Sequence, residues 1–218
     1  MSDGAVMEPI LVVLLVTDFL LLGSSRFRTC IKLVSVQGVV LGILPALLHG
    51  AENPVRAWLL AAGSIVLKGV VFPWLLLRIL RETPVRREAQ PFVGHNLSIL
   101  LGVAMLVFSL WVGSTLVLPA TTQLDTSLLV SAGLATLLIG LFLTISRRTA
   151  LSQVLGYIVV ENGIYTFGVV LVGGVPALVE LGVLMDAFVA VFIMSIAAYH
   201  ISREFEHINV DQLDRLKG

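Results

Sequence analysis

Four ionisable residues lie inside long apolar runs of this sequence, where hydrocarbon would normally surround them. They are Asp18, Lys68, Glu161 and Asp186. Each costs about 2.5–3.5 kcal/mol at the centre of a membrane helix, so such residues usually face a bundle interior, a wet cavity or a partner subunit. Buried acids and amines in these positions are typical of proton relays. The residue types therefore predict proton transfer within a membrane.

Glu161 and Asp186 give the strongest indication, because both fall near the middle of consecutive apolar runs. A tight turn, "VGGVP" at 172–176, joins the two runs, which makes them antiparallel neighbours. Two carboxyl groups at similar depth can pass a proton through an intervening water. Tyr157 and Tyr165 lie four residues before and after Glu161, on roughly the same helix face, and would extend a hydrogen-bonded path. The alternative is that Glu161 bonds a neighbouring helix and has no other role.

Lys68 and Asp18 each allow two interpretations. A buried lysine can lose its proton, so Lys68 is a candidate relay, but it could equally be a static counter-charge to an acid on another helix or subunit. Asp18 lies towards the end of its run, in "LLVTDFLLLG". Pairing of Asp18 with a basic partner or a hydroxyl group is an alternative to a transport role.

The composition defines the environment that must position these residues. Hydrophobic residues make up 57% of the chain and charged residues 13%, with a mean hydropathy of +1.01. Soluble proteins carry about 25% charged residues. The zero net charge predicts no affinity for nucleic acid. The single cysteine, Cys30, excludes an internal disulfide and a cysteine-based metal cluster. No nucleotide-binding loop, nucleophile constellation or metal motif is recognisable, so we expect no cofactor and no catalysis by the chain alone.

The apolar blocks predict an all-α, polytopic membrane protein, because runs near 20 apolar residues are long enough to cross a bilayer. We count seven spans with short connections. Only the segment 80–95 is long enough to form a surface of its own. The predicted spans are 6–24, 31–49, 57–79, 96–118, 126–145, 150–172 and 176–200.

Positive charges predict the orientation of these spans, since cytoplasmic loops carry an excess of lysine and arginine. With seven spans, Arg56 is the one basic residue of the outer loops. Twelve others fall on the opposite side, which places the N-terminus outside and the C-terminus inside the cytoplasmic membrane of a prokaryote. They are Arg26, Arg28, Lys32, Arg78, Arg81, Arg86, Arg87, Arg147, Arg148, Arg203, Arg215 and Lys217.

A weak internal repeat suggests how the chain is organised. "SSRFRTCIKLVSVQGVV" at 24–40 resembles "ISRRTALSQVLGYIVV" at 145–160, and "LRILRE" resembles the later "YHISRE". Two parallel three-helix units joined by one linking helix would explain both similarities. This 3+1+3 plan divides the chain into a unit with its loop at 1–95, a linking helix at 96–125, and a second unit with its tail at 126–218.

The last spans carry a pattern that resembles a known family. "ISRRTALSQVLGYIVVENG", "MDAFVA" and the tail "HINVDQLDRLKG" are similar to the small three-helix membrane subunit of respiratory complex I, the NuoK type. The similarity covers 142–218, and the four preceding spans fit the NuoK-like E components of hydrogenase-4 better. Asp186 matches the family's third-helix acid. The second-helix acid would match Ile158, and Glu161 lies one turn beyond it, a displacement of about 4.5 Å.

The resemblance implies a non-catalytic membrane subunit of a hydrogenase-4-like, formate-hydrogenlyase-like or complex-I-like oxidoreductase. Its implied partners are antiporter-like and hydrogenase-like membrane subunits, and its implied role is to help move protons. An alternative is the C-type subunit of a multi-subunit cation/proton antiporter, which shares the NuoK pattern. A scaffold whose buried charges only join helices is a further alternative.

Overall fold

The computed structural model describes residues 4–49, 54–82, 93–116, 124–147, 149–171 and 193. These residues form helices, and no strand is present among them. The continuous apolar sequence explains this, because a backbone without access to water must satisfy its own hydrogen bonds. The elements are α1 (Gly4–Gly23), α2 (Phe27–His49), α3 (Pro54–Ser64), η1 (Ile65–Val71), α4 (Phe72–Glu82), α5 (His95–Thr115), α6 (Leu124–Ser146) and α7 (Ala150–Leu171).

The helices agree with the predicted spans wherever the structure describes the chain. Among the described residues, four helical segments are long and apolar enough to cross a membrane, and they match the second to fifth predicted spans. Helices α1 and α7 occupy the first and sixth predicted spans. The seventh, 176–200, lies outside the described residues except for Ile193. The four segments are Phe27–Leu44, Ala61–Arg81, His95–Thr115 and Ser127–Ser146.

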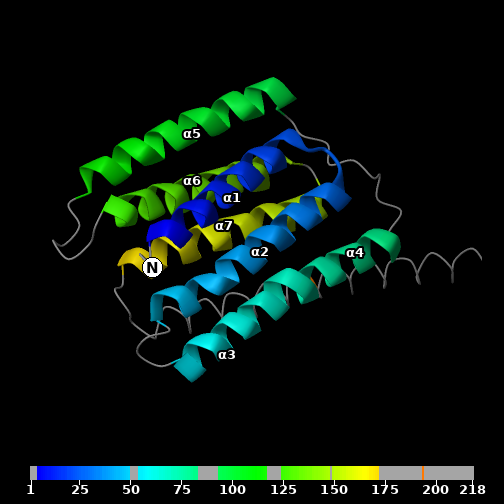
Figure 1. The fold of residues 1–218 in the computed structure, drawn as a ribbon. Coiled ribbons are helices and arrows are strands. Elements are labelled where there is room, and N and C mark those ends of the chain that lie inside the picture. Colours follow the sequence, from blue (N-terminus) through cyan, green and yellow to red (C-terminus); the bar gives the residue numbers. More distant parts are fainter. Residues whose placement is uncertain are drawn as a thin grey trace, which may run out of the picture.

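Two helical hairpins, α1 with α2 and α6 with α7, lie side by side at the centre of the bundle (Figure 1). Helix α1 packs against α2 and α6, and α2 packs against α7. Helix α5 lies along α1 and α6 on one side, whereas α3, η1 and α4 lie along α2 on the other. Side chains from α1, α2, α6, α7 and η1 can therefore meet between the hairpins.

Glycine residues bring α6 and α7 into backbone contact. A Cβ atom at Gly140 would lie 2.4 Å from the backbone nitrogen of Val160, and one at Gly163 would lie 2.4 Å from that of Leu137. Real Cβ atoms do not approach so closely, so larger residues would separate the helices. Small residues at such interfaces are the usual route to close packing in membranes. The contact fixes the rotation of α7, and with it the direction of the Glu161 side chain.

The third predicted span is one continuous helical rod with a π-helical segment in its middle. The π-helix Ile65–Val71 separates α3 from α4 and carries Lys68. The hydroxyl of Ser35 on α2 donates to the carbonyl oxygen of Gly69 at 2.7 Å. π-Helical turns within longer helices are frequent at functional sites, since they redirect side chains. The apolar pattern of 57–79 gave no indication of this segment.

Ile193 belongs to the main apolar core. Its side chain is 1% exposed and lies in a cluster that includes Phe72, Leu75 and Ile79 of α4 together with residues of α1, α2, α6 and α7. The cluster therefore connects a residue of the seventh predicted span to the rest of the bundle.

Candidate functional site

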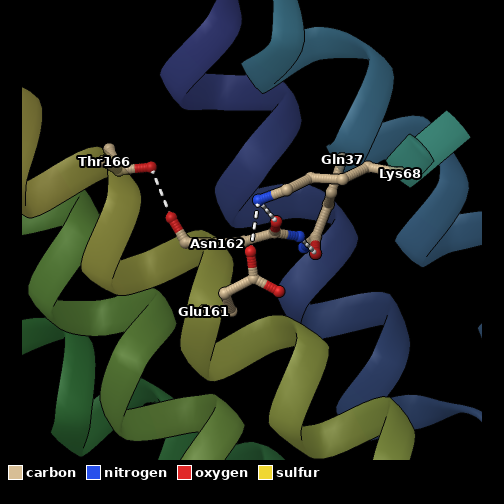
Figure 2. A network of polar contacts seen from close by, with 5 residues as sticks. All are labelled: Gln37, Lys68, Glu161, Asn162 and Thr166. Atoms are coloured by element: carbon tan, nitrogen blue, oxygen red, sulfur yellow. Dashed lines mark hydrogen bonds and ion pairs between the residues drawn. The ribbon is translucent and has the colours of Figure 1, made fainter. Parts of the chain in front are cut away.

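Lys68 and Glu161 form a buried ion pair between η1 and α7. The Nζ atom of Lys68 lies 2.8 Å from Oε1 of Glu161, and both side chains are 2% exposed. Figure 2 shows the lysine side chain extending from its helix to end between Glu161 and Asn162. Two of the four ionisable residues singled out in the sequence are thus direct partners. The lysine thus lies beside an acid on another helix, a geometry that fits both interpretations of Lys68.

Gly38 on α2 makes room for the lysine. A Cβ atom at this position would lie 2.5 Å from Cβ of Lys68 and 3.0 Å from its backbone carbonyl carbon. A larger residue would therefore push η1 away from α2. The small-xxx-small pattern "GVVLG" at 38–42 explains this close approach, which brings the ammonium group to α7.

Two amide side chains connect the ion pair to Asp18. Nζ of Lys68 donates to Oδ1 of Asn162 at 3.4 Å, and Nδ2 of Asn162 donates to Oε1 of Gln37 at 3.3 Å. Nε2 of Gln37 then donates to Oδ1 of Asp18 at 2.7 Å. The contacts around Lys68 and Asn162 are visible in Figure 2. A continuous series of polar contacts therefore crosses the bundle from η1 through α7 and α2 to α1.

Asp18 is fully buried and is held by hydrogen bonds from two other helices. Its Oδ2 atom accepts a hydrogen bond from the hydroxyl of Thr136 on α6 at 2.6 Å. The same amide nitrogen of Gln37 that bonds Asp18 also donates to the hydroxyl of Thr17 at 2.9 Å. The alternative in which Asp18 pairs with a hydroxyl group thus describes its contacts. We call the following set the polar network: Asp18, Gln37, Lys68, Thr136, Glu161 and Asn162.

The polar network contains two kinds of link. The contact between an ammonium group and a carboxylate can carry a proton, because both groups change protonation state. The amides of Gln37 and Asn162 do not release protons, but their dipoles both point their donor ends towards Asp18. This direction favours a positive charge at the Lys68 end and a negative charge at the Asp18 end. The amides therefore connect the two ends electrostatically, without conducting protons between them.

The two tyrosines of the sequence analysis lie in different surroundings. Nζ of Lys68 is 5.1 Å from the centre of the Tyr165 ring, a distance at which a cation is attracted to an aromatic face. Tyr157 packs against the main apolar core. Asp186 lies outside the described residues. Ile158, which matches the position of the family's second-helix acid, is buried in the apolar core.

Sequence reasoning missed Gln37 and Thr136, and it assigned no role to Asn162. Each is a polar residue within an apolar run, which is a weak signal for a single hydroxyl or amide. All three side chains are fully buried. Among the described residues, no group of three or more histidine, cysteine, aspartate or glutamate side chains could hold a metal ion.

A bundle of apolar helices around a continuous buried polar network defines an integral membrane protein with a polar interior. Comparison with known proteins specifies the class further. A family model for NADH-ubiquinone/plastoquinone oxidoreductase chain 4L matches residues 126–218. The uncharacterized protein Rv0085 of Mycobacterium tuberculosis is 32% identical over 209 residues, which cover 94% of this chain and 92% of that protein.

The alignment with a second relative covers both chains completely. Hydrogenase-4 component E of Escherichia coli is 25% identical over 218 residues, 100% of each protein. The chain belongs to the chain 4L-related family of membrane proteins that includes hydrogenase-4 component E. The resemblance of the last spans to the NuoK type is therefore confirmed over 126–218, and the similarity to hydrogenase-4 component E extends over the whole chain. No solved structure matches the sequence.

Proposed function

We propose that this protein is a non-catalytic membrane subunit of a hydrogenase-4-like or complex-I-like oxidoreductase and contributes to its proton path. The observation that carries the proposal is the buried contact between Lys68 and Glu161, linked by amides to Asp18. Burying two charges costs several kcal/mol per ion before their attraction is counted. An ion pair with that cost at the centre of a membrane bundle is better explained by proton exchange than by stability.

The proposed elementary step is a proton transfer within the pair. The N–H bond at Nζ of Lys68 breaks and an O–H bond forms at Oε1 of Glu161, so that both groups become neutral. The reverse transfer restores the ion pair. A distance of 2.8 Å is already a hydrogen-bond distance, so the step needs no movement of the helices. The ring of Tyr165 would stabilise the charged form of Lys68. The carboxylate of Asp18 would stabilise the same charged form through the amides.

Asp186 is proposed as the next acid of the path. A helix over 176–200, as the sequence predicts, would place Asp186 seven residues before Ile193, two turns away on the same face and about 10.5 Å along the axis. Ile193 belongs to the same apolar core cluster as Leu75, which itself follows Lys68 by seven residues. In the predicted topology the third span, which carries Lys68, and the seventh span, which carries Asp186, run in the same direction. Asp186 would then lie at the depth of Lys68.

Membership of a redox complex is proposed from the relatives. One relative is by name a component of hydrogenase-4, and the family model is named for a chain of NADH-quinone oxidoreductase. Both names describe parts of larger assemblies. This chain would accordingly work beside other membrane subunits in the cytoplasmic membrane, with the redox chemistry in its partners.

Co-purification tests the assembly. An affinity-tagged copy, expressed from its own locus and extracted in mild detergent, should retain antiporter-like and hydrogenase-like membrane subunits together with iron–sulfur proteins. Recovery with antiporter subunits and without redox proteins would favour the alternative, a C-type subunit of a cation/proton antiporter. Recovery of the chain as a lone functional protein would contradict both.

A further inference from the structure

A small pocket lies at one end of the bundle, away from the polar network. The last turns of α1 and α6 and the first turn of α5 surround it, and these three helix ends lie together in Figure 1. Its volume is about 30 Å³. Because a water-sized probe occupies about 10–15 Å³, the pocket has room for two or three atoms of that size. The lining residues are Leu22, Ser24, Ser25, His95, Ser98, Phe142, Leu143, Ser146 and Arg147.

Arg147 gives the pocket a buried positive charge. Its side chain is 5% exposed, and its Nη2 atom donates to the carbonyl oxygens of Leu21 at 2.7 Å and Ser24 at 3.1 Å. Nη1 donates to the sulfur of Cys30 at 3.6 Å. These acceptors are all neutral. Among the described residues, no carboxylate pairs with Arg147, and the pocket lining contains no aspartate or glutamate. Within the part of the chain that the structure describes, the guanidinium charge is therefore not neutralised by a carboxylate.

The helix ends modify this charge without cancelling it. The C-termini of α1 and α6 each contribute about −0.5 charge, and the N-terminus of α5 contributes about +0.5. With the full charge of Arg147, the sum remains near +0.5. The first N–H groups of α5 also have no intrahelical acceptor, and its N-cap residue, Gly94, provides no side-chain cap. The hydroxyls of Ser24 and Ser25 and the imidazole of His95 add further donors.

The remaining lining is apolar and comes from α1 and α6. Leu22, Phe142 and Leu143 line the same cavity as the polar groups. A pocket that combines a buried arginine, free N–H groups and an apolar wall suits an anionic group attached to a hydrocarbon body. The predicted topology places this end of the bundle at the inner surface of the membrane, where anionic lipids are found.

We propose that this pocket binds a phosphate group, with two non-bridging oxygens directed at Arg147 and the first turn of α5. The phosphate can come from a lipid headgroup or from free phosphate, and the experiment separates these sources. The site is independent of the proposed proton path, because none of its lining residues belongs to the polar network.

Charge substitutions that leave Arg147 intact test the proposal. His95→Glu introduces a negative charge into the pocket. Asn96→Glu is the matched control, because it adds the same charge to the same exposed turn of α5 without lining the pocket. Ser25→Glu adds the same charge from the connection between α1 and α2 and is used if His95→Glu does not fold. Native mass spectrometry of the full chain, purified with its natural partners, measures retained lipid after exchange into phosphatidylglycerol or a phosphate-free galactolipid.

The wild-type protein and Asn96→Glu should retain phosphatidylglycerol and lose the galactolipid. His95→Glu and Ser25→Glu should need about tenfold more phosphatidylglycerol for the same occupancy, as expected for loss of a charge-assisted contact. Inorganic phosphate that binds while the phospholipid does not would support the site with free phosphate as the source. Equal retention of both lipids with no binding of inorganic phosphate, or unchanged phosphatidylglycerol occupancy in both pocket variants, would overturn the proposal.

Discussion

The ammonium group of Lys68 lies 2.8 Å from the carboxylate of Glu161, and neither side chain is more than 2% exposed. The two residues come from a π-helical segment and from α7, which the bundle brings together. Buried ion pairs are often replaceable by apolar residues without loss of stability, because desolvation offsets their attraction. Removing one partner alone is strongly destabilising for the same reason. Comparing stability and proton pumping in variants that lack one or both partners therefore separates a functional pair from a structural one.

Neutralising the acids of the proposed path should slow proton movement in the complexes that assemble. Glu161→Gln and Asp186→Asn keep the side-chain shapes but remove the protonatable oxygen. We expect coupled proton pumping in inverted vesicles to fall to less than about a tenth of the wild-type rate. Glu8→Gln is the control, since Glu8 is exposed on α1. Wild-type pumping by both variants would support the scaffold alternative.

Removing the lysine alone should cost more stability than removing the whole pair. Lys68→Met leaves Glu161 buried without its ammonium partner, and we expect a loss of about 3–5 kcal/mol. The double variant Lys68→Met, Glu161→Leu removes both charges and should recover most of that loss, although pumping stays low. Reversible unfolding of the purified protein in detergent measures the differences as a double-mutant cycle. Additive effects of the two substitutions would contradict direct pairing.

The buried acid of α1 should stabilise the bundle through its acceptor oxygens. Asp18→Ala leaves donors of Gln37 and Thr136 without their acceptor, so we expect a loss of about 1–3 kcal/mol for each donor. Asp18→Asn keeps one acceptor oxygen and should cost less. Thr136→Val should add little further loss when Asp18 is already alanine. A full additional loss in that background would show that Thr136 acts through another contact.

The amide of Gln37 should transmit the effect of Asp18 to the ion pair. In the wild-type background we expect Asp18→Asn to lower the pumping rate, because the negative end of the amide series is lost. In a Gln37→Leu background the same substitution should have no further effect. Gln153→Leu, at an exposed position of α7, is the matched control and should leave the effect of Asp18→Asn unchanged. Equal effects of Asp18→Asn in the wild-type and Gln37→Leu backgrounds would rule out transmission through the amide.

Glycine positions on two helices should respond in opposite ways to alanine. A Cβ atom at Gly163 would meet the backbone of α6, so Gly163→Ala should destabilise the protein by about 1–3 kcal/mol. A Cβ atom at Gly63 on α3 would meet no atom within 4 Å, so Gly63→Ala should be neutral or stabilise by up to about 1 kcal/mol. Thermal unfolding in the same detergent compares them. Equal destabilisation by both substitutions would exclude close helix contact as the cause.

Much of the fold was predictable because its main determinant is local. Each apolar run has to form a helix, and six of the seven predicted spans coincide with helices of the described residues. The four ionisable residues were also visible, since a charge within an apolar run stands out by composition alone. The partners of these residues were not predictable. Lys68 was expected to be a relay or a counter-charge, and only the packing of both η1 and α7 against α2 shows that its partner is Glu161.

The amino-acid sequence by itself determined the all-helical, membrane-embedded character of this protein, its family and the acids and amine most costly to bury. These properties depend on the local density of apolar residues and on the expense of placing charge among them. The tertiary structure decided that Gln37 and Asn162 join Lys68 and Glu161 to Asp18, and that Thr136 completes the contacts of Asp18. Hydrogen bonds between helices depend on the rotation and depth of each helix. Glycine contacts such as that of Gly163 with α6 set the rotation, and they form only when distant parts of the chain pack together.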